Sequence, residues 1–285
     1  MPDPKDLTVP ARDGFELKAT LYGPSSDIQR LVIVNSATAV PRRLYRHFGA
    51  FMAAQGWTTL TYDYRGVGQS RPKATLRGFQ AKARDWVLQD MAGVLDWACA
   101  SLPSQKLYLV GHSIGGQLAG LLDKPDAVDA MVTFSAQSGH WRYQGGGQKL
   151  AVALHSYATL PLLAVVCGYM PWSLVGGEDI PRGVALEWAS WCRHPDYVLG
   201  DDTLPLERFA DFKAPVLAYS IEDDNWGTRR SVDMMMNRAY PNVTRKHIDP
   251  AQMGIDKLGH MGVFRPHASA IWEEAAAWLE AAPNG

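Results

Sequence analysis

Short apolar runs alternate with amphipathic segments along the first half of the chain. The runs at 31–35, 58–64 and 107–110 are rich in aliphatic, β-branched and aromatic residues, as expected for strands covered on both faces. Helical spacing is found at 44–55 and at 81–100. In the second of these segments, one face is apolar at Val87, Met91, Val94, Leu95 and Ala98. The alternation predicts an α/β fold, with a mainly parallel sheet and helices on both of its faces.

Five further strands bring the expected sheet to eight strands. Segments 7–10 and 15–22 alternate around the turn Arg12-Asp13-Gly14, which predicts a leading antiparallel hairpin. The remaining strands are expected at 130–135, 214–220 and 244–248. A helical pattern at 229–240 lies between the last two strands, and another at 268–282 follows them.

The regular alternation stops between residues 136 and 212. This stretch is rich in Trp, Tyr and Gly, with helical patterns only near 148–160 and 184–192. We therefore expect a core domain formed by residues 1–137 and 213–285, with residues 138–212 as an insertion.

Composition and charge are those of an ordinary soluble globular protein. The 285 residues are 47% hydrophobic and 20% charged, and the formal net charge of −1 argues against a nucleic-acid partner. Three dispersed cysteines, without a Cys-x-x-Cys, indicate buried thiols in a reducing compartment. The first residues resemble no signal peptide, so we expect a cytoplasmic protein. The sequence is compatible with a homodimer but does not determine the oligomeric state.

One apolar stretch, 157–175, approaches the length of a membrane span. Pro161 and Pro171 are expected to interrupt it, and Gly168 weakens it further as a helix. If residues before and after this stretch share one site, a single span would also separate them. We therefore expect a buried or site-covering helix and no membrane span.

Candidate chemistry begins at Gly111-His112-Ser113-Ile114-Gly115, a G-x-S-x-G sequence. A strand pattern precedes it and a helix pattern follows it, which is the context of a strained turn that exposes a nucleophilic serine. Glycines on both sides allow the close backbone approach that such a turn needs. The neighbouring His112 is expected to point away from Ser113 and to support the turn.

A serine nucleophile needs a base, and the base needs an orienting carboxylate. The strand pattern at 214–220 runs into three carboxylates, Glu222, Asp223 and Asp224, which by themselves could equally form a solvated acidic turn. Of the eight histidines, His260 follows both the serine and the acidic loop and lies between a strand and the last helix. Ser113 and His260, with one carboxylate from this loop, are thus the candidate catalytic set.

These features resemble the α/β-hydrolase superfamily, in the lipase-like branch that includes serine aminopeptidases and monoacylglycerol lipases. The order Ser113, Asp224, His260 is similar to the family's order of nucleophile, acid and base. The segment 62–70 resembles the family's D-x-R-G-x-G-x-S, where Asp63, Arg65 and Gly66 are expected to be structural. The family's acid usually lies in a Gly-x-x-Asp turn, and Ile221 replaces that glycine here. Alignment from Pro215 favours Asp224 as the acid, with Asp223 as the alternative.

The resemblance implies an oxyanion hole made of two backbone N–H groups. Ile114 is expected to supply one and Ala37 the other. The chain has Asn35-Ser36-Ala37-Thr38 where family members usually carry His-Gly, which leaves the geometry of this loop open.

The resemblance also implies that the insertion 138–212 forms a helical lid over the site. Its aromatic residues favour a hydrophobic acyl substrate, although they could instead pack the lid onto the core. The expected activity is that of a serine carboxylesterase acting on a small-molecule ester, with no cofactor and no metal ion. An acyltransferase with the same triad and a non-catalytic binding protein on the same fold are the alternatives.

Overall fold

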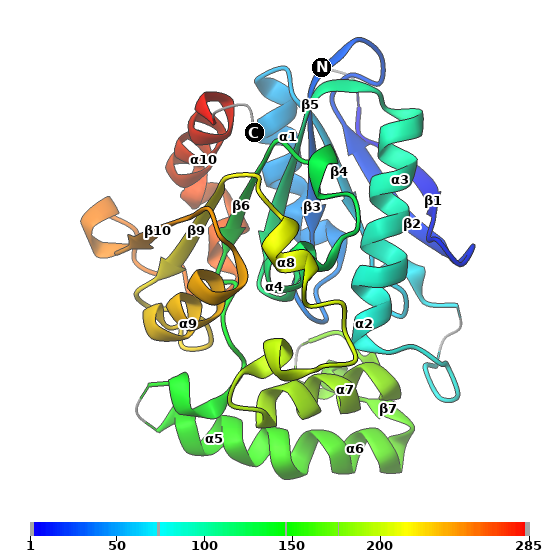
Figure 1. The fold of residues 1–285 in the computed structure, drawn as a ribbon, viewed down its shortest axis with the longest axis vertical. Helices are drawn as coiled ribbons and strands as arrows, with labels where there is room; N and C mark the ends of the chain where they lie inside the picture. Colours follow the sequence, from blue (N-terminus) through cyan, green and yellow to red (C-terminus); the bar gives the residue numbers. More distant parts are fainter. Residues whose placement is uncertain (1–2, 73–74, 146, 176, 283–285) are drawn as a thin grey trace.

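The computed structural model describes residues 3–72, 75–145, 147–175 and 177–282. Its centre is an eight-stranded sheet, as predicted, and the strands follow the order β1-β2-β4-β3-β5-β6-β9-β10 (Figure 1). The strands are β1 (Lys5–Pro10), β2 (Glu16–Tyr22), β3 (Ile28–Asn35), β4 (Thr58–Tyr62), β5 (Ser104–His112), β6 (Ala130–Phe134), β9 (Val216–Ile221) and β10 (Val243–Ile248).

The sheet is antiparallel at one edge and parallel elsewhere. The β1–β2 hairpin is closed around the predicted turn, with Pro10 opposite Glu16, and β2 pairs antiparallel with β4. From β4 to β10 every neighbouring pair is parallel. In such a sheet the carboxyl ends of the parallel strands meet along one edge, where ligands bind.

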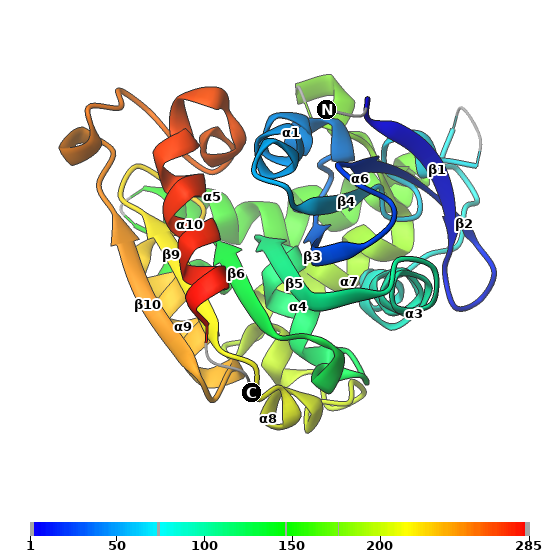
Figure 2. The ribbon, with the colours of Figure 1, turned by 90° about the horizontal axis from the view of Figure 1, so that it is seen from above.

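Helices cover both faces of the sheet, as expected (Figure 2). Helices α1 and α10 lie on one face, and α3, α4 and α9 lie on the other. Their bounds are α1 (Arg46–Ala54), α2 (Ala83–Asp85), α3 (Ala92–Ser101), α4 (Ile114–Leu118), α8 (Arg208–Asp211), α9 (Arg229–Ala239) and α10 (Ser269–Ala281). A π-helical segment, η3 (Trp86–Met91), joins α2 to α3, so the helix predicted at 81–100 is continuous but not uniformly α.

Strand β3 shows why the central strands carry uninterrupted apolar runs. Leu31 and Ile33 belong to the hydrophobic core beneath α3, α4 and α9. Val32 and Val34 belong to a second core beneath α1 and α10. Because successive side chains of a strand point to opposite faces, a strand buried on both sides must be apolar at every position.

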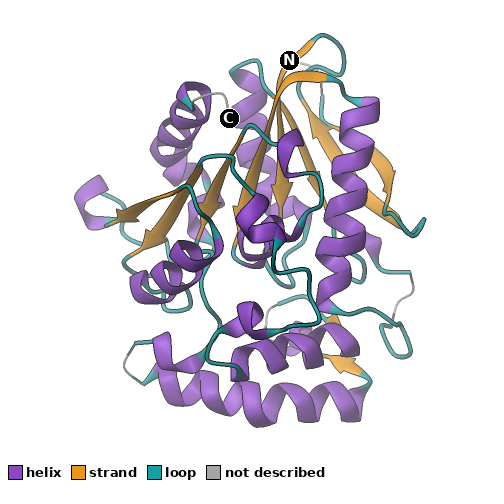
Figure 3. Cartoon of the chain, in the orientation of Figure 1, coloured by secondary structure: helices purple, strands orange, loops and turns teal. Residues whose placement is uncertain are grey.

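The helical segments 148–167 and 182–193 lie beyond the carboxyl ends of the strands, whereas α8 lies beside α4 (Figures 1 and 3). The insertion 138–212 contains one long helical rod, with α5 (Gln148–Leu154), the π-helical η7 (His155–Thr159) and α6 (Leu160–Cys167). Helix α7 (Arg182–Arg193) packs against α6, and the short strands β7 (Tyr169–Met170) and β8 (Ile180–Pro181) pair antiparallel.

The expectation that Pro161 would interrupt the apolar stretch is wrong. The helix continues past Pro161 and ends only at Gly168, whose φ of 78° gives a left-handed cap. The π-helical turn of η7 directly precedes this proline, and such turns are where a helix absorbs a local irregularity of its hydrogen bonding. Pro161 lies in the first turn of α6, where a missing N–H is tolerated.

By length and composition, Gln148–Cys167 is a helix that could cross a membrane, with a mean hydropathy of 1.9 over an 18-residue window that is 22% buried. Its outward side chains are apolar and more than half exposed: Leu150, Leu154, Tyr157, Leu162, Val165 and Val166. However, Ser113 before this helix and Trp172 and Trp188 after it line one pocket. A crossing at this helix would place them on opposite sides of the bilayer.

The cysteines differ from expectation in their burial. Cys192 is buried, but Cys99 is exposed and Cys167 is half-buried, and all three are free thiols. The prediction of three buried thiols is therefore wrong for two of them. Cys99 lies in the last turn of α3.

Candidate active site

Ser113 lies in a strained turn between β5 and α4. Its backbone has φ 51° and ψ −119°, a conformation that L-residues seldom adopt. A Cβ added at Gly111 would collide with the backbone of Gly116, and one added at Gly115 would collide with the carbonyl oxygen of Asn35. The two glycines of the G-x-S-x-G sequence therefore permit the close approach of strand, turn and helix that places Ser113 at the wall of a pocket.

The structure brings His260 and Asp224 together at the same edge of the sheet. His260 Nδ1 lies 2.7 Å from Asp224 Oδ2, and the Asp224 side chain is fully buried. Asp224 Oδ1 accepts hydrogen bonds from the backbone N–H groups of Trp226 and Gly227. Burial acts to raise the pKa of Asp224, but His260 outweighs it and the pKa falls to about 2. Asp224 is therefore ionised near neutral pH and suited to orient an imidazole.

Asp223, the alternative acid, has a different set of contacts. Its two carboxylate oxygens accept hydrogen bonds from the backbone N–H groups of Leu258 and Gly259, at 2.9 and 2.8 Å. Asp223 thus anchors the loop that carries His260, while Asp224 contacts the imidazole itself. The third carboxylate, Glu222, binds His247 at 2.6 Å.

Ser113 and His260 line the same pocket, but their side chains are not joined by a hydrogen bond in the described structure. Instead, Ser113 Oγ donates to Gln137 Oε1 over 3.4 Å. Catalytic hydrogen bonds in ligand-free enzymes are often long and shorten when substrate binds. The geometry is compatible with a serine and a base that engage on substrate binding.

His112 supports the His260 loop, which is a more specific role than the sequence indicated. Its Nε2 lies 2.8 Å from the backbone oxygen of His260, and its Nδ1 lies 2.9 Å from Tyr45 Oη. Because a carbonyl oxygen can only accept, the His112 proton resides on Nε2 and Tyr45 donates to Nδ1. Burial, followed by the charge of His260, lowers the pKa of His112 to about 3. His112 is thus a neutral positioning residue.

This low pKa predicts a pH-dependent stability. Unfolded His112 binds a proton near pH 6.5, whereas the folded protein binds it near pH 3, so the unfolded state takes up more protons between these values. The stabilisation is complete above pH 6.5 and is lost as the pH falls. At pH 5 we expect His112 to account for a loss of about 2 kcal/mol in the free energy of unfolding.

Urea unfolding of wild type and His112→Asn at pH 7.5 and pH 5 measures this difference. His112→Asn should show the smaller loss on acidification, and His267→Asn, which removes an exposed histidine, should match wild type. Equal pH slopes for wild type and His112→Asn would contradict the proposed cause.

The loop after β3 holds one predicted oxyanion donor, Ala37, in an unexpected contact. The Ala37 N–H donates to Tyr45 Oη over 2.9 Å. The next N–H, that of Thr38, has no hydrogen bond within the described residues, and both residues line the Ser113 pocket. Ile114, the other predicted donor, is the first residue of α4, so its N–H is not accepted by a helical carbonyl.

The pocket at Ser113 is small and mainly aromatic. It has a volume of about 240 Å³ and is lined by Ala37, Thr38, Ser113, Gln137, Trp172, Trp188, Trp226, His260 and Met261. Trp172 and Trp188 come from the insertion, so two of its predicted aromatic residues do face the site. Another, Trp191, serves packing instead and is buried within the fold.

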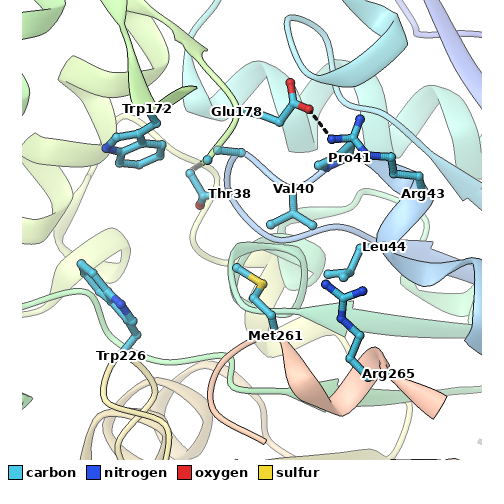
Figure 4. A pocket seen from close by; sticks show the side chains of 12 residues that line it. Thr38, Val40, Pro41, Arg43, Leu44, Trp172, Glu178, Trp226, Met261 and Arg265 are labelled. Carbon is cyan, nitrogen blue, oxygen red and sulfur yellow. Dashed lines mark hydrogen bonds and ion pairs between the residues drawn. The ribbon is translucent and has the colours of Figure 1, made fainter. Parts of the chain in front are cut away.

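A second, larger cavity of about 550 Å³ adjoins this pocket. The two share Thr38, Trp172, Trp226 and Met261. Trp172 and Trp226 lie at one side of this outer cavity, and Arg43, Glu178 and Arg265 lie at the other (Figure 4). Arg43 and Glu178 form an ion pair of 2.9 Å. The site therefore has an inner aromatic compartment at Ser113 and an outer compartment with charged walls.

The segment resembling D-x-R-G-x-G-x-S builds a buried ionic framework. Asp63 accepts hydrogen bonds from Arg42, both from its backbone and from its side chain, and from the Gln69 N–H. Arg65 binds Asp90 and Asp13. None of these residues lines the Ser113 pocket, which agrees with a structural role.

A metal centre has no obvious location in the part of the chain that the structure describes. Within it, no group of three or more His, Cys, Asp or Glu side chains is arranged to hold an ion.

Comparison with known proteins assigns the family. The profile of the serine aminopeptidase S33 hydrolases matches residues 27–185, more than half of the chain. The chain belongs to this family. The matched region contains the Ser113 turn and continues into the insertion. The chain is thus an α/β-hydrolase.

Solved structures with the same fold align with nearly the whole chain. The esterase Pf2001 of Pyrococcus furiosus is 17% identical, with a TM-score of 0.62 over 98% of this chain and 90% of that one. Est1E of Butyrivibrio proteoclasticus, bound to ferulic acid, is 18% identical, with a TM-score of 0.64 over 96% and 98%. DcsB, in complex with its substrate analogue, is 14% identical, with a TM-score of 0.69 over 99% and 100%. No curated protein matches in sequence.

Sequence reasoning missed three pocket or support residues. Gln137 and Trp226 line the Ser113 pocket, and Tyr45 connects Ala37 to His112. Gln137 had one usable signal, its place two residues after the predicted strand at 130–135. Tyr45 had none, since it falls within an ordinary helical pattern.

Proposed function

We propose that this protein is a serine hydrolase that cleaves carboxylic esters of small, hydrophobic substrates. The observation that carries the proposal is the 2.7 Å contact between His260 and the buried Asp224, in the pocket that Ser113 lines. An ionised acid, an oriented imidazole and a serine that lines the pocket from a strained turn together supply nucleophilic acyl transfer. A binding protein would need none of these three groups in this arrangement.

In the proposed reaction, Ser113 Oγ attacks the ester carbonyl and His260 Nε2 takes the hydroxyl proton. Asp224 holds Nδ1–H and stabilises the imidazolium. The tetrahedral intermediate collapses, the C–O bond to the alcohol breaks, and His260 returns the proton to the leaving oxygen. Water, activated by His260, then attacks the acyl-enzyme, and the carboxylic acid leaves as Ser113 regains its proton.

The oxyanion of each intermediate needs two N–H donors. We propose Ile114 as one, as expected from the sequence. The N–H of Ala37 is engaged by Tyr45 Oη, so we propose the neighbouring Thr38 N–H as the second donor in its place. Both proposed donors border the Ser113 turn or its pocket.

The two compartments suggest how the ester is placed. His260 must protonate the leaving alcohol, and Met261, which follows it, borders both cavities. We therefore place the alcohol toward the outer cavity and the acyl group in the inner pocket. At about 240 Å³ this pocket lies below the range of about 300–1,000 Å³ typical of sites for drug-sized ligands, which favours short acyl groups.

Labelling with a fluorophosphonate probe tests the proposal. Wild type should label and Ser113→Ala should not, while Ser101→Ala, which removes an exposed serine, should label like wild type. A wild-type protein that resists the probe, or a Ser113→Ala variant that still labels, would exclude a Ser113 nucleophile. A series of p-nitrophenyl esters should then favour butyrate over dodecanoate.

A further inference from the structure

A chain of hydrogen bonds connects the insertion to the nucleophile. Trp188 Nε1 donates to Tyr197 Oη over 2.9 Å, and Tyr197 Oη donates to Gln117 Oε1 over 2.9 Å. Gln117 Nε2 then donates to Gln137 Oε1 over 3.3 Å. Gln137 Oε1 also accepts the hydrogen bond of Ser113 Oγ. Tyr197, Gln117 and Gln137 are all buried.

The indole at one end fixes the direction of every hydrogen bond in this chain. An indole N–H can only donate, so Tyr197 Oη accepts a hydrogen bond from Trp188 and donates its own hydrogen bond to Gln117. Gln117 therefore turns its oxygen to Tyr197 and its amide nitrogen to Gln137. In consequence Gln137 turns its oxygen toward Gln117 and Ser113, and its Nε2 points away from them.

The Gln137 amide nitrogen is thus a hydrogen-bond donor without an acceptor among the described residues. It has no hydrogen bond within the described residues, and it is not among the fully buried polar atoms that lack a partner, so it reaches accessible space. The residue lines the inner pocket beside Ser113, where three indoles, of Trp172, Trp188 and Trp226, form most of the remaining wall. An unpaired donor in an apolar wall discriminates strongly for a ligand that supplies an acceptor.

We propose that Gln137 is a specificity residue and that the acyl group of the natural ester carries an oxygen acceptor on its α-carbon. This inference rests on the proposed esterase function, and on the placement of the acyl group in the inner pocket. The acceptor is a hydroxyl, ether or keto oxygen that accepts from Gln137 Nε2, while the indoles contact the rest of a short acyl group. Tyr197 acts as a positioning residue, because its hydroxyl sets the orientation of both glutamines.

Two isosteric esters test the proposal: p-nitrophenyl methoxyacetate, with an ether oxygen on the α-carbon, and p-nitrophenyl butyrate, with a methylene there. The readout is the ratio of their kcat/KM values, corrected for their rates of alkaline hydrolysis. One net hydrogen bond should make this ratio about fivefold higher in wild type than in Gln137→Leu. Tyr197→Phe should lower the ratio as well, because Gln117 is then free to turn over. Gln55→Leu, a substitution on the surface, should keep the wild-type ratio.

A second pair separates the two sides of the ester. Butyrate esters of 2-methoxyethanol and of n-butanol differ by an ether oxygen in the alcohol, and their ratio should not depend on Gln137. If Gln137→Leu changes the ratio for this pair and not for the acyl pair, the placement of the acyl group in the inner pocket is overturned. If Gln137→Leu and Tyr197→Phe label with fluorophosphonate and neither pair responds, this inference falls while the proposed function stands. If wild type does not label, the proposed function fails first.

Discussion

Replacing His260 with alanine is expected to lower kcat for ester hydrolysis by about a millionfold, as is replacing Ser113 with alanine. The reason is that the serine and its base act as one unit: without His260, no group accepts the Ser113 proton. The double variant should therefore be no slower than either single variant. Steady-state rates on p-nitrophenyl butyrate, with active-site titration of wild type, measure all three.

The control for this experiment is His267→Ala, which removes an exposed histidine on the segment that follows the His260 loop. It should hydrolyse the ester at the wild-type rate. Losses that multiply in the double variant would mean that Ser113 and His260 act in separate steps, and the triad assignment would then be wrong.

The second large effect is expected from the two neighbouring aspartates. Asp224→Asn should lower kcat by about ten-thousandfold, because an amide opposite His260 Nδ1 favours the wrong tautomer and cannot stabilise the imidazolium. Asp223→Asn keeps one oxygen acceptor, which can serve only one of the two N–H groups, of Leu258 or Gly259, and presents an NH2 donor to the other. Displacement of the His260 loop should lower kcat by at most about a hundredfold.

The order of these two losses decides between the aspartates. Circular dichroism of both variants should show wild-type secondary structure, so that the rates report on chemistry. A larger loss in Asp223→Asn than in Asp224→Asn would overturn the assignment of Asp224 as the acid.

Much of the fold could be predicted because its strands are buried on both faces. In β3, every position from Leu31 to Val34 is apolar, and the two sides of the strand enter two different hydrophobic cores. The helix at 148–167 was harder to predict. Pro161 argued for a break, but a π-helical turn just before it lets the helix continue, and no periodicity in the sequence reveals such a turn.

The candidate site divides in a similar way. Ser113, Asp224 and His260 each follow a strand pattern, and a parallel sheet gathers such strand ends at one edge. Their meeting was therefore predictable from order and spacing. The contact of Ala37 with Tyr45, and that of His112 with the His260 backbone, join residues far apart in the sequence through side-chain direction alone.

The sequence by itself determined the layered α/β architecture, the turn at Ser113 and the order of the three candidate catalytic residues, because local apolar patterns and glycines govern these features. Only the tertiary structure decided that Asp224 contacts His260 while Asp223 holds the adjacent loop. It also decided that Gln137 turns its amide oxygen toward Gln117 and Ser113. The physical reason is that hydrogen bonds are directional over about 3 Å, and packing from several elements sets directions that no local pattern encodes.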